Sequence, residues 1–437
     1  MVCPRLERAT VPFLLIATFA GASLEPQPAR ADAREREQLA ALTRAMVESI
    51  RKRPAASTRV LKRYSRIEAT GSFDRAGRYA LHRKLLGALR GSRDPSLLRV
   101  ARSTLRLSPK TNLAAQVLVL KALVAPDFPG SREERIELLV RQAKGSSSRL
   151  QVWGLRLLGD SRWPEAVDAM IRLLDHEEAS GRSGSFLWHL TSGELHRVLG
   201  SRQAHGIAAT LRARWEKMGR KVPKKPDHGA PRGVTVGFFG DKVSPRSVFV
   251  IDTSSSMRQL ATLPGSGGRI VVKGDEKARL RGRREPKVEI VKRELERAVA
   301  VLQPIFKFNI LSYSATFHPW KGSGKLRLHP ATRENVASGR DFARTLTTDS
   351  GTNIYDSLEA AMSIPDVDTV YLLSDGQPSR GGTKPQIEAN ARLGNYLLGI
   401  RIVTYGFTPE GKGSFDEEFM KRLARSHRGW YRRLNGG

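Results

Sequence analysis

An acid and two hydroxyl residues alternate directly after a short apolar run, and together they could bind a metal ion. The run, Val248 to Ile251, is continuously apolar, which predicts a strand buried on both faces. Asp252, Ser254 and Ser256 follow at the carboxyl end of that strand, where open α/β sheets bind their ligands. Their oxygens suit a hard divalent cation such as Mg²⁺. A serine-rich turn that caps the next helix is the alternative interpretation.

Two later stretches offer further oxygen atoms in a similar setting. Thr352 lies on a loop before a helical pattern that begins at Ile354. Asp375 follows a second continuous apolar run, Val370 to Leu373, and precedes a glycine. Both residues are therefore expected at the ends of regular elements, where side chains from different parts of the chain can meet.

The five residues together resemble the metal-ion-dependent adhesion site of the von Willebrand factor A domain. That site consists of a D-x-S-x-S motif, a distant threonine and a distant aspartate, on loops at one end of a parallel sheet. The matching residues in this chain are Asp252, Ser254, Ser256, Thr352 and Asp375. The resemblance covers residues 247–437 and implies a doubly wound, Rossmann-like α/β domain. It departs from the family at Ser255, where many members have glycine.

The resemblance implies a binding protein and not an enzyme. The three hydroxyl residues would give oxygen ligands to Mg²⁺ (or Mn²⁺ or Ca²⁺), and the two aspartates would reach the ion directly or through water. An acidic side chain of a protein partner would complete the coordination sphere. No catalytic residues are expected, because the sequence has no H-E-x-x-H motif, no P-loop spacing and no nucleophile with a partner base. A hydrolase is the weakest alternative.

Residues 34–220 are expected to form an all-α domain, because apolar residues recur at helical spacing between turn residues. The segment Leu150 to Asp175, broken at Gly159-Asp160, resembles a HEAT-type helix pair, which must stack on neighbours to bury its apolar face. An irregular helical domain is the alternative. The layout resembles multidomain proteins of bacterial envelopes, in which the helical domain would be a second binding surface or a spacer.

A basic, proline-containing linker, 221–246, is expected to connect this domain to the α/β domain. The insertion 258–286 then starts directly after the D-x-S-x-S motif, so it should lie beside the metal site. It is rich in glycine and arginine, and it either captures an acidic ligand or is a solvated loop. The candidate ligand-binding residues are Arg279, Arg281, Arg283 and Arg284.

The chain has 437 residues and a net charge of +32, because 75 Lys and Arg outnumber 43 Asp and Glu. Such a charge attracts anionic partners at long range. An anionic envelope polymer or an acidic protein is expected; nucleic acid is not, because no nucleic-acid-binding motif accompanies the charge. A basic envelope protein that binds polyanions without the metal is the alternative function.

Residues 1–33 are predicted to be a signal peptide. A basic start precedes the apolar run Val11–Ala20, and small residues allow cleavage after Ala22 or Ala33. The run is too short to span a bilayer. The single cysteine, Cys3, lies in this segment, so the mature chain would have no disulfide. We therefore expect an exported, periplasmic or extracellular protein without a transmembrane segment; a subunit of an intracellular ATPase machine is the rival interpretation.

Overall fold

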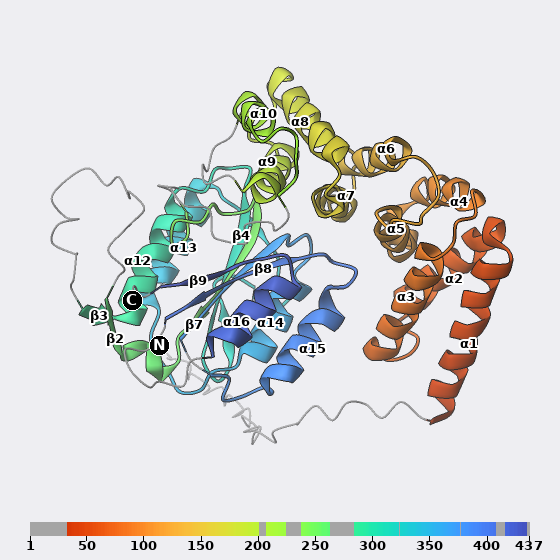
Figure 1. The fold of residues 1–437 in the computed structure, drawn as a ribbon. Coiled ribbons are helices and arrows are strands. Elements are labelled where there is room, and N and C mark those ends of the chain that lie inside the picture. Colours follow the sequence, from red (N-terminus) through yellow and green to blue (C-terminus); the bar gives the residue numbers. More distant parts are fainter. Residues whose placement is uncertain are drawn as a thin grey trace, which may run out of the picture.

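The chain folds as a helical region followed by an α/β domain, which is the order that the sequence predicts (Figure 1). The computed structural model describes residues 33–200, 207–223, 237–262, 284–322, 324–375, 377–407 and 416–434. Among these residues, no helix is both long and apolar enough to cross a membrane.

The helical region consists of amphipathic helices around a shared core. They are α1 (Ala33–Lys52), α2 (Ser57–Thr70), α3 (Arg75–Arg90), α4 (Ser96–Leu105), α5 (Pro109–Leu123), α6 (Arg132–Ala143), α7 (Ser148–Ser161), α8 (Pro164–Ala179), α9 (Phe186–Leu199) and α10 (Ala208–Lys217), with a short 3-10 helix at Pro54–Ala56. Ser131 and Glu134 form a reciprocal capping box at the start of α6, as the sequence predicts.

Alternate helices of this region form two layers. The inner layer faces the α/β domain and consists of α3, α5, α7 and α9, each in contact with the next (Figure 1). The outer layer includes α2 against α4 and α6 against α8. Stacking of this kind buries the apolar faces that single helix pairs would expose. The resemblance to HEAT-type repeats stays a prediction.

The α/β domain is built on a seven-stranded sheet with the order β5-β4-β1-β7-β8-β9, with β6 also paired to β4. The strands are β1 (Arg246–Asp252), β4 (Lys307–Tyr313), β5 (Phe317–Pro319), β6 (His329–Pro330), β7 (Thr369–Ser374), β8 (Arg401–Gly406) and β9 (Tyr431–Arg433). Strands β4, β1, β7, β8 and β9 run parallel, whereas β5 and β6 are antiparallel to β4. All residues of β7 and all but the first residue of β1 are buried, which explains their continuous apolar runs.

Helices cover both faces of this sheet, and each face has its own core. Phe249 and Ile251 of β1 pack in the core beneath α12 (Lys287–Ala300) and α13 (Arg333–Thr345). Val248 and Val250 pack in the opposite core, beneath α14, α15 and α16. These three helices are Ile354–Ser363, Lys384–Asn395 and Glu417–Ser426. The alternation follows from the two-residue period of a strand.

Three local predictions differ from the structure. Helix α7 continues through Gly159-Asp160 and ends at Ser161, and the capping residue Arg162 adopts a left-handed backbone with φ 59°. The sequence predicts a capping box of Ser414 and Glu417 at the start of the last helix; α16 is capped by Asp416, which accepts a hydrogen bond from the Phe419 amide, and Ser414 lies outside the described residues. The sequence also predicts a short strand at 234–239, but in the described part of this range Phe238 forms only an isolated bridge with Asp241.

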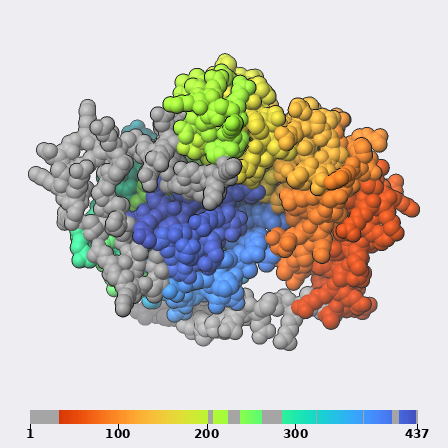
Figure 2. All heavy atoms as spheres, in the orientation of Figure 1, coloured from red at the N-terminus to blue at the C-terminus, as the bar shows by residue number. Residues whose placement is uncertain are grey.

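The helical region packs against the amino ends of the sheet strands. Trp153 of α7 donates a hydrogen bond from Nε1 to the Leu397 carbonyl oxygen at 2.8 Å. Arg156 Nη2 donates to the Asp368 carbonyl oxygen at 2.9 Å, directly before β7. Figure 2 shows the orange and yellow helices in direct contact with the blue part of the α/β domain. The carboxyl ends of the same strands lie at the opposite edge of the sheet.

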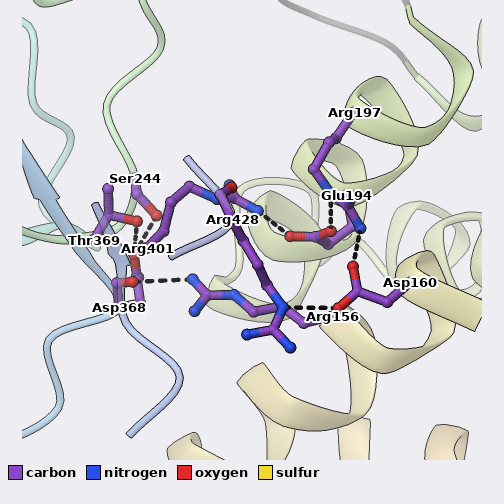
Figure 3. A network of polar contacts seen from close by, with 9 residues as sticks. All are labelled: Arg156, Asp160, Glu194, Arg197, Ser244, Asp368, Thr369, Arg401 and Arg428. Carbon is purple, nitrogen blue, oxygen red and sulfur yellow. Dashed lines mark hydrogen bonds and ion pairs between the residues drawn. The ribbon is translucent and has the colours of Figure 1, made fainter. Parts of the chain in front are cut away.

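Charged side chains from both parts meet in this interface (Figure 3). Glu194 of α9 forms ion pairs with Arg197 and with Arg401 of β8, and Asp160 pairs with Arg197 and Arg428. We call these five residues and Arg156 the interdomain charge network. Burial alone would raise the pKa of Glu194, but the surrounding arginines outweigh it and lower the pKa to about 2. The carboxylate is therefore charged when the two parts are in contact.

Candidate metal centre

Four of the five predicted ligand residues meet at the carboxyl edge of the sheet. Asp252 is the last residue of β1, and Asp375 directly follows the neighbouring β7. Ser254 and Ser256 lie in the turn after β1, which enters a short 3-10 helix at Ser255–Arg258. Thr352 lies on the loop before α14. The ends of adjacent parallel strands thus place side chains together that are far apart in the sequence.

Hydrogen bonds link four of the five residues. The hydroxyl oxygens of Ser254 and Ser256 are 2.9 Å apart, and Ser256 Oγ donates to Asp375 Oδ1 at 2.6 Å. The Ser254 amide donates to Asp252 Oδ1 at 2.8 Å. The fifth residue, Thr352, is held from its backbone, because its amide donates to Ser379 Oγ at 2.9 Å.

Two residues that the sequence analysis did not single out orient the Asp252 carboxylate. Ser374 Oγ donates to Asp252 Oδ2 at 2.7 Å. The Tyr313 hydroxyl lies 3.4 Å from the same oxygen and donates to the Leu373 carbonyl oxygen at 3.1 Å. Ser374 precedes Asp375 in β7, so the pattern Ser-Asp at the end of a buried strand was the available signal. Such outer partners fix the direction of a ligand carboxylate.

The site concentrates negative charge in a buried place. Asp252 is 0% exposed and Asp375 is 4% exposed. Burial, with the nearby Asp375 carboxylate as a second cause, raises the pKa of Asp252 to about 6. A divalent cation between the two carboxylates would offset both the cost of burying their charge and their mutual repulsion, since the charge of a bound ion dominates the local electrostatics.

A buried lysine adjoins these carboxylates, and the sequence analysis missed it. Lys287, the first residue of α12, places Nζ 2.6 Å from Asp375 Oδ2 and 2.9 Å from Gln259 Oε1. The side chains of Lys287 and Asp375 are 3% and 0% exposed. The burial of this lysine cannot be predicted from the sequence, because a charged residue in the first turn of a helix ordinarily faces solvent.

The donor atoms fit a hard divalent cation. The five residues offer two carboxylates and three hydroxyls, and all of these ligands are oxygen. Across the described chain, no three His, Cys, Asp or Glu side chains gather as a metal-ligating group. Hydroxyl oxygens must therefore supply part of any coordination here, and the residues present would hold Mg²⁺ better than a thiolate-seeking or imidazole-seeking ion.

The ends of the basic insertion lie beside this centre. The strands β2 (Leu260–Thr262) and β3 (Arg284–Pro286) pair antiparallel, with Leu260 opposite Pro286. Of the candidate ligand-binding arginines, Arg284 is an exposed residue of β3. Arg279, Arg281 and Arg283 lie outside the described residues, so their role stays a prediction.

Comparison with known proteins identifies relatives of part of the chain. No family model matches. The human inter-alpha-trypsin inhibitor heavy chain H6 is 30% identical over 163 residues, which are 34% of this chain and 12% of that protein. The human heavy chain H4 is 29% identical over 192 residues, which are 40% of this chain and 19% of that protein. The chain thus spans less than a fifth of the length of these relatives.

Solved structures similar to part of the chain were also found. A von Willebrand factor type A protein from Catenulispora acidiphila is 17% identical, with a TM-score of 0.33, over 44% of this chain and 38% of that one. The proximal thread matrix protein 1 of the mussel byssus, with a zinc-occupied MIDAS motif, is 17% identical, with a TM-score of 0.29, over 43% and 41%. In the order of its elements, this chain is a helical region followed by an α/β domain that resembles the von Willebrand factor A domain.

Proposed function

We propose that this protein binds a divalent cation, Mg²⁺ in the first place, and uses it to recognise an acidic side chain of a protein ligand. The observation that supports the proposal is the contact of two carboxylates with two serines, Ser254 and Ser256, at the carboxyl edge of β1 and β7, with Thr352 on the loop before α14. Mg²⁺ keeps part of its coordination sphere for water or for a ligand oxygen. A carboxylate of the partner would take that position.

The arrangement of the two parts supports a binding role. In the described part of the chain, the helical region contacts the amino ends of the strands and, through Arg75, helices α14 and α15, and no hydrogen bond or ion pair joins it to the candidate metal residues. The helical region would act as a support or as a second binding surface. Export by the predicted signal peptide would bring this surface to partners outside the cytoplasm.

Calorimetric titration of MgCl₂ into the purified protein tests the proposal. We expect saturable binding in the wild type and its loss in Asp252→Ala. Asp341→Ala is a matched control, because Asp341 is an exposed acid of α13 with a 70% exposed side chain. Equal heats from the wild type and Asp252→Ala would refute a metal-dependent function.

The alternative of polyanion binding has an observation of its own. A cavity of about 570 Å³ lies at the amino edge of the sheet, away from the metal centre. Its lining includes Lys321, Lys325, Arg327 and His329, with no acidic residue. Burial, with Arg327 and Lys321 as lesser causes, lowers the pKa of His329.

Retention on a heparin column separates the two functions. Polyanion binding would persist in a chelator, fall steeply with salt and weaken in Lys325→Glu. Metal-dependent recognition would not respond to Lys325→Glu. Retention that is unchanged by this variant would remove the cavity from consideration.

A further inference from the structure

We propose that Lys287 is a tethered cation of the metal centre, which lowers the affinity of the site for a divalent ion. The inference rests on the proposed function, because it concerns the regulation of the same site. It identifies a residue that controls metal affinity without being a ligand.

The contacts of Asp375 carry the argument. One carboxylate oxygen, Oδ1, accepts from Ser256 Oγ at 2.6 Å, and the other, Oδ2, accepts from Lys287 Nζ at 2.6 Å. The ammonium group therefore shares a ligand carboxylate with any ion bound at the hydroxyl side. Because the Asp375 carboxylate also attracts the Lys287 ammonium group, it would bind a metal ion more weakly.

Lys287 cannot easily withdraw from this position. Its side chain is 3% exposed, and Gln259 Oε1 takes a second hydrogen bond at 2.9 Å. Its backbone amide donates to the Gln259 carbonyl oxygen at 3.0 Å, at the base of the β2–β3 hairpin. An ammonium that left Asp375 without reaching water would bear a large desolvation cost. These contacts thus hold the Lys287 side chain in the site.

Counting charges shows what this lysine does. Asp252 and Asp375 carry two negative charges, and Lys287 reduces the total to minus one. A bound divalent ion then brings the centre to plus one, whereas without the lysine the centre would be neutral. The lysine therefore opposes metal binding but leaves the loaded centre positive, which favours an anionic ligand.

Calorimetric titration of MgCl₂ into the wild type and Lys287→Met tests the inference. Removing the charge is expected to lower the Kd for Mg²⁺ at least tenfold, which corresponds to about 1.4 kcal/mol. Lys287→Arg keeps the charge and should retain the affinity of the wild type. Lys292→Met, at a 20% exposed lysine of the same helix, should also leave it unchanged. Adding Asp252→Ala to Lys287→Met should abolish binding.

The possible outcomes separate this inference from the proposed function. If the wild type binds Mg²⁺ and Lys287→Met binds it equally or more weakly, the inference is overturned and the metal centre stands. If Lys287→Met binds and the wild type does not, the inference is supported. If no variant binds, both are overturned. Circular dichroism and melting in EDTA check folding, and Lys287→Gln takes the place of a misfolded Met variant, since its amide can still donate to Asp375.

Discussion

Arg401 at the start of β8 forms a buried ion pair with Glu194 of α9, which joins the α/β domain to the helical region (Figure 3). Both side chains are well shielded, at 11% and 2% exposed. The pair lies at the amino end of its strand, whereas Asp252 lies at the carboxyl end of β1. The structure thus separates attachment of the helical region from the candidate binding edge by the length of the sheet.

Replacing Glu194 by Gln should strongly destabilise the protein. The variant would leave Arg197 and Arg401 in a buried place without their shared counter-ion, which typically costs about 3–5 kcal/mol. Thermal melting by circular dichroism measures the effect. Glu137→Gln is the control, because the Glu137 and Arg141 side chains are 66% and 51% exposed and such pairs contribute about 0–1 kcal/mol. Equal melting temperatures for the two variants would mean that the network does not hold the parts together.

Gly399→Ala should also weaken the interface. Gly399 has φ +66°, and a Cβ there would lie 2.8 Å from the Trp153 ring. We expect a loss of about 1–3 kcal/mol, from backbone strain and overpacking.

Gly87→Ala is the opposite case, because Gly87 is an exposed residue of α3 with nothing within 4 Å of its Cβ position. It should stabilise the protein by about 0.5–1 kcal/mol. Urea unfolding of both variants checks the two signs.

Lys121 of α5 should make the folding stability of the protein rise with pH above about pH 7. Its Nζ donates to the Tyr396 carbonyl oxygen at 2.5 Å, and burial, with Arg428 and Arg90 as lesser causes, lowers its pKa to about 7. Between pH 7 and about 10.5, the unfolded chain therefore binds more protons at this lysine than the folded chain does. Stability from this group must rise with pH across that window.

Comparison with Lys121→Met isolates this contribution. The stability of the wild type relative to the variant should increase by about 3 kcal/mol between pH 7 and pH 10. Lys110→Met, at an exposed position of the same helix, should show no such trend. A difference between wild type and Lys121→Met that stays constant with pH would contradict the prediction.

The sequence predicted the α/β domain well because its signals are local. The run Val248–Ile251 faces two cores, so it must be apolar throughout, and the ligand motif follows at once. The role of Lys287 was missed, because only the packing of α12 against β7 brings its ammonium group to Asp375. Helix α2 was also missed, although Val60, Leu61 and Tyr64 are buried at helical spacing, because five basic and acidic residues interrupt the pattern.

The docking of the helical region could not be predicted from the sequence. Its polar contacts include backbone carbonyls, such as those of Leu397 and Asp368, and any residue type presents a carbonyl. Arg156 is 1% exposed, yet in the sequence it is one arginine among many on an amphipathic helix. Tertiary contacts of this kind leave no local pattern.

Asp252→Asn should raise the melting temperature of the protein in EDTA. The buried Asp252 carboxylate lies near Asp375, and an uncharged amide removes that repulsion while it can still accept from the Ser254 amide. We expect a gain on the order of 1–2 kcal/mol, or roughly 1–2 °C for a chain of 437 residues. MgCl₂ should stabilise the wild type but not the variant, since a ligand stabilises only the state that binds it.

The control for this variant is Asp341→Asn. It should melt like the wild type with and without MgCl₂, because the Asp341 side chain on α13 is exposed. A lower melting temperature for Asp252→Asn in EDTA would show that the carboxylate supports the fold by itself. The expected result would show that the Asp252 carboxylate destabilises the metal-free protein and that a bound divalent ion offsets this loss. The carboxylate would then serve metal binding and not the stability of the fold.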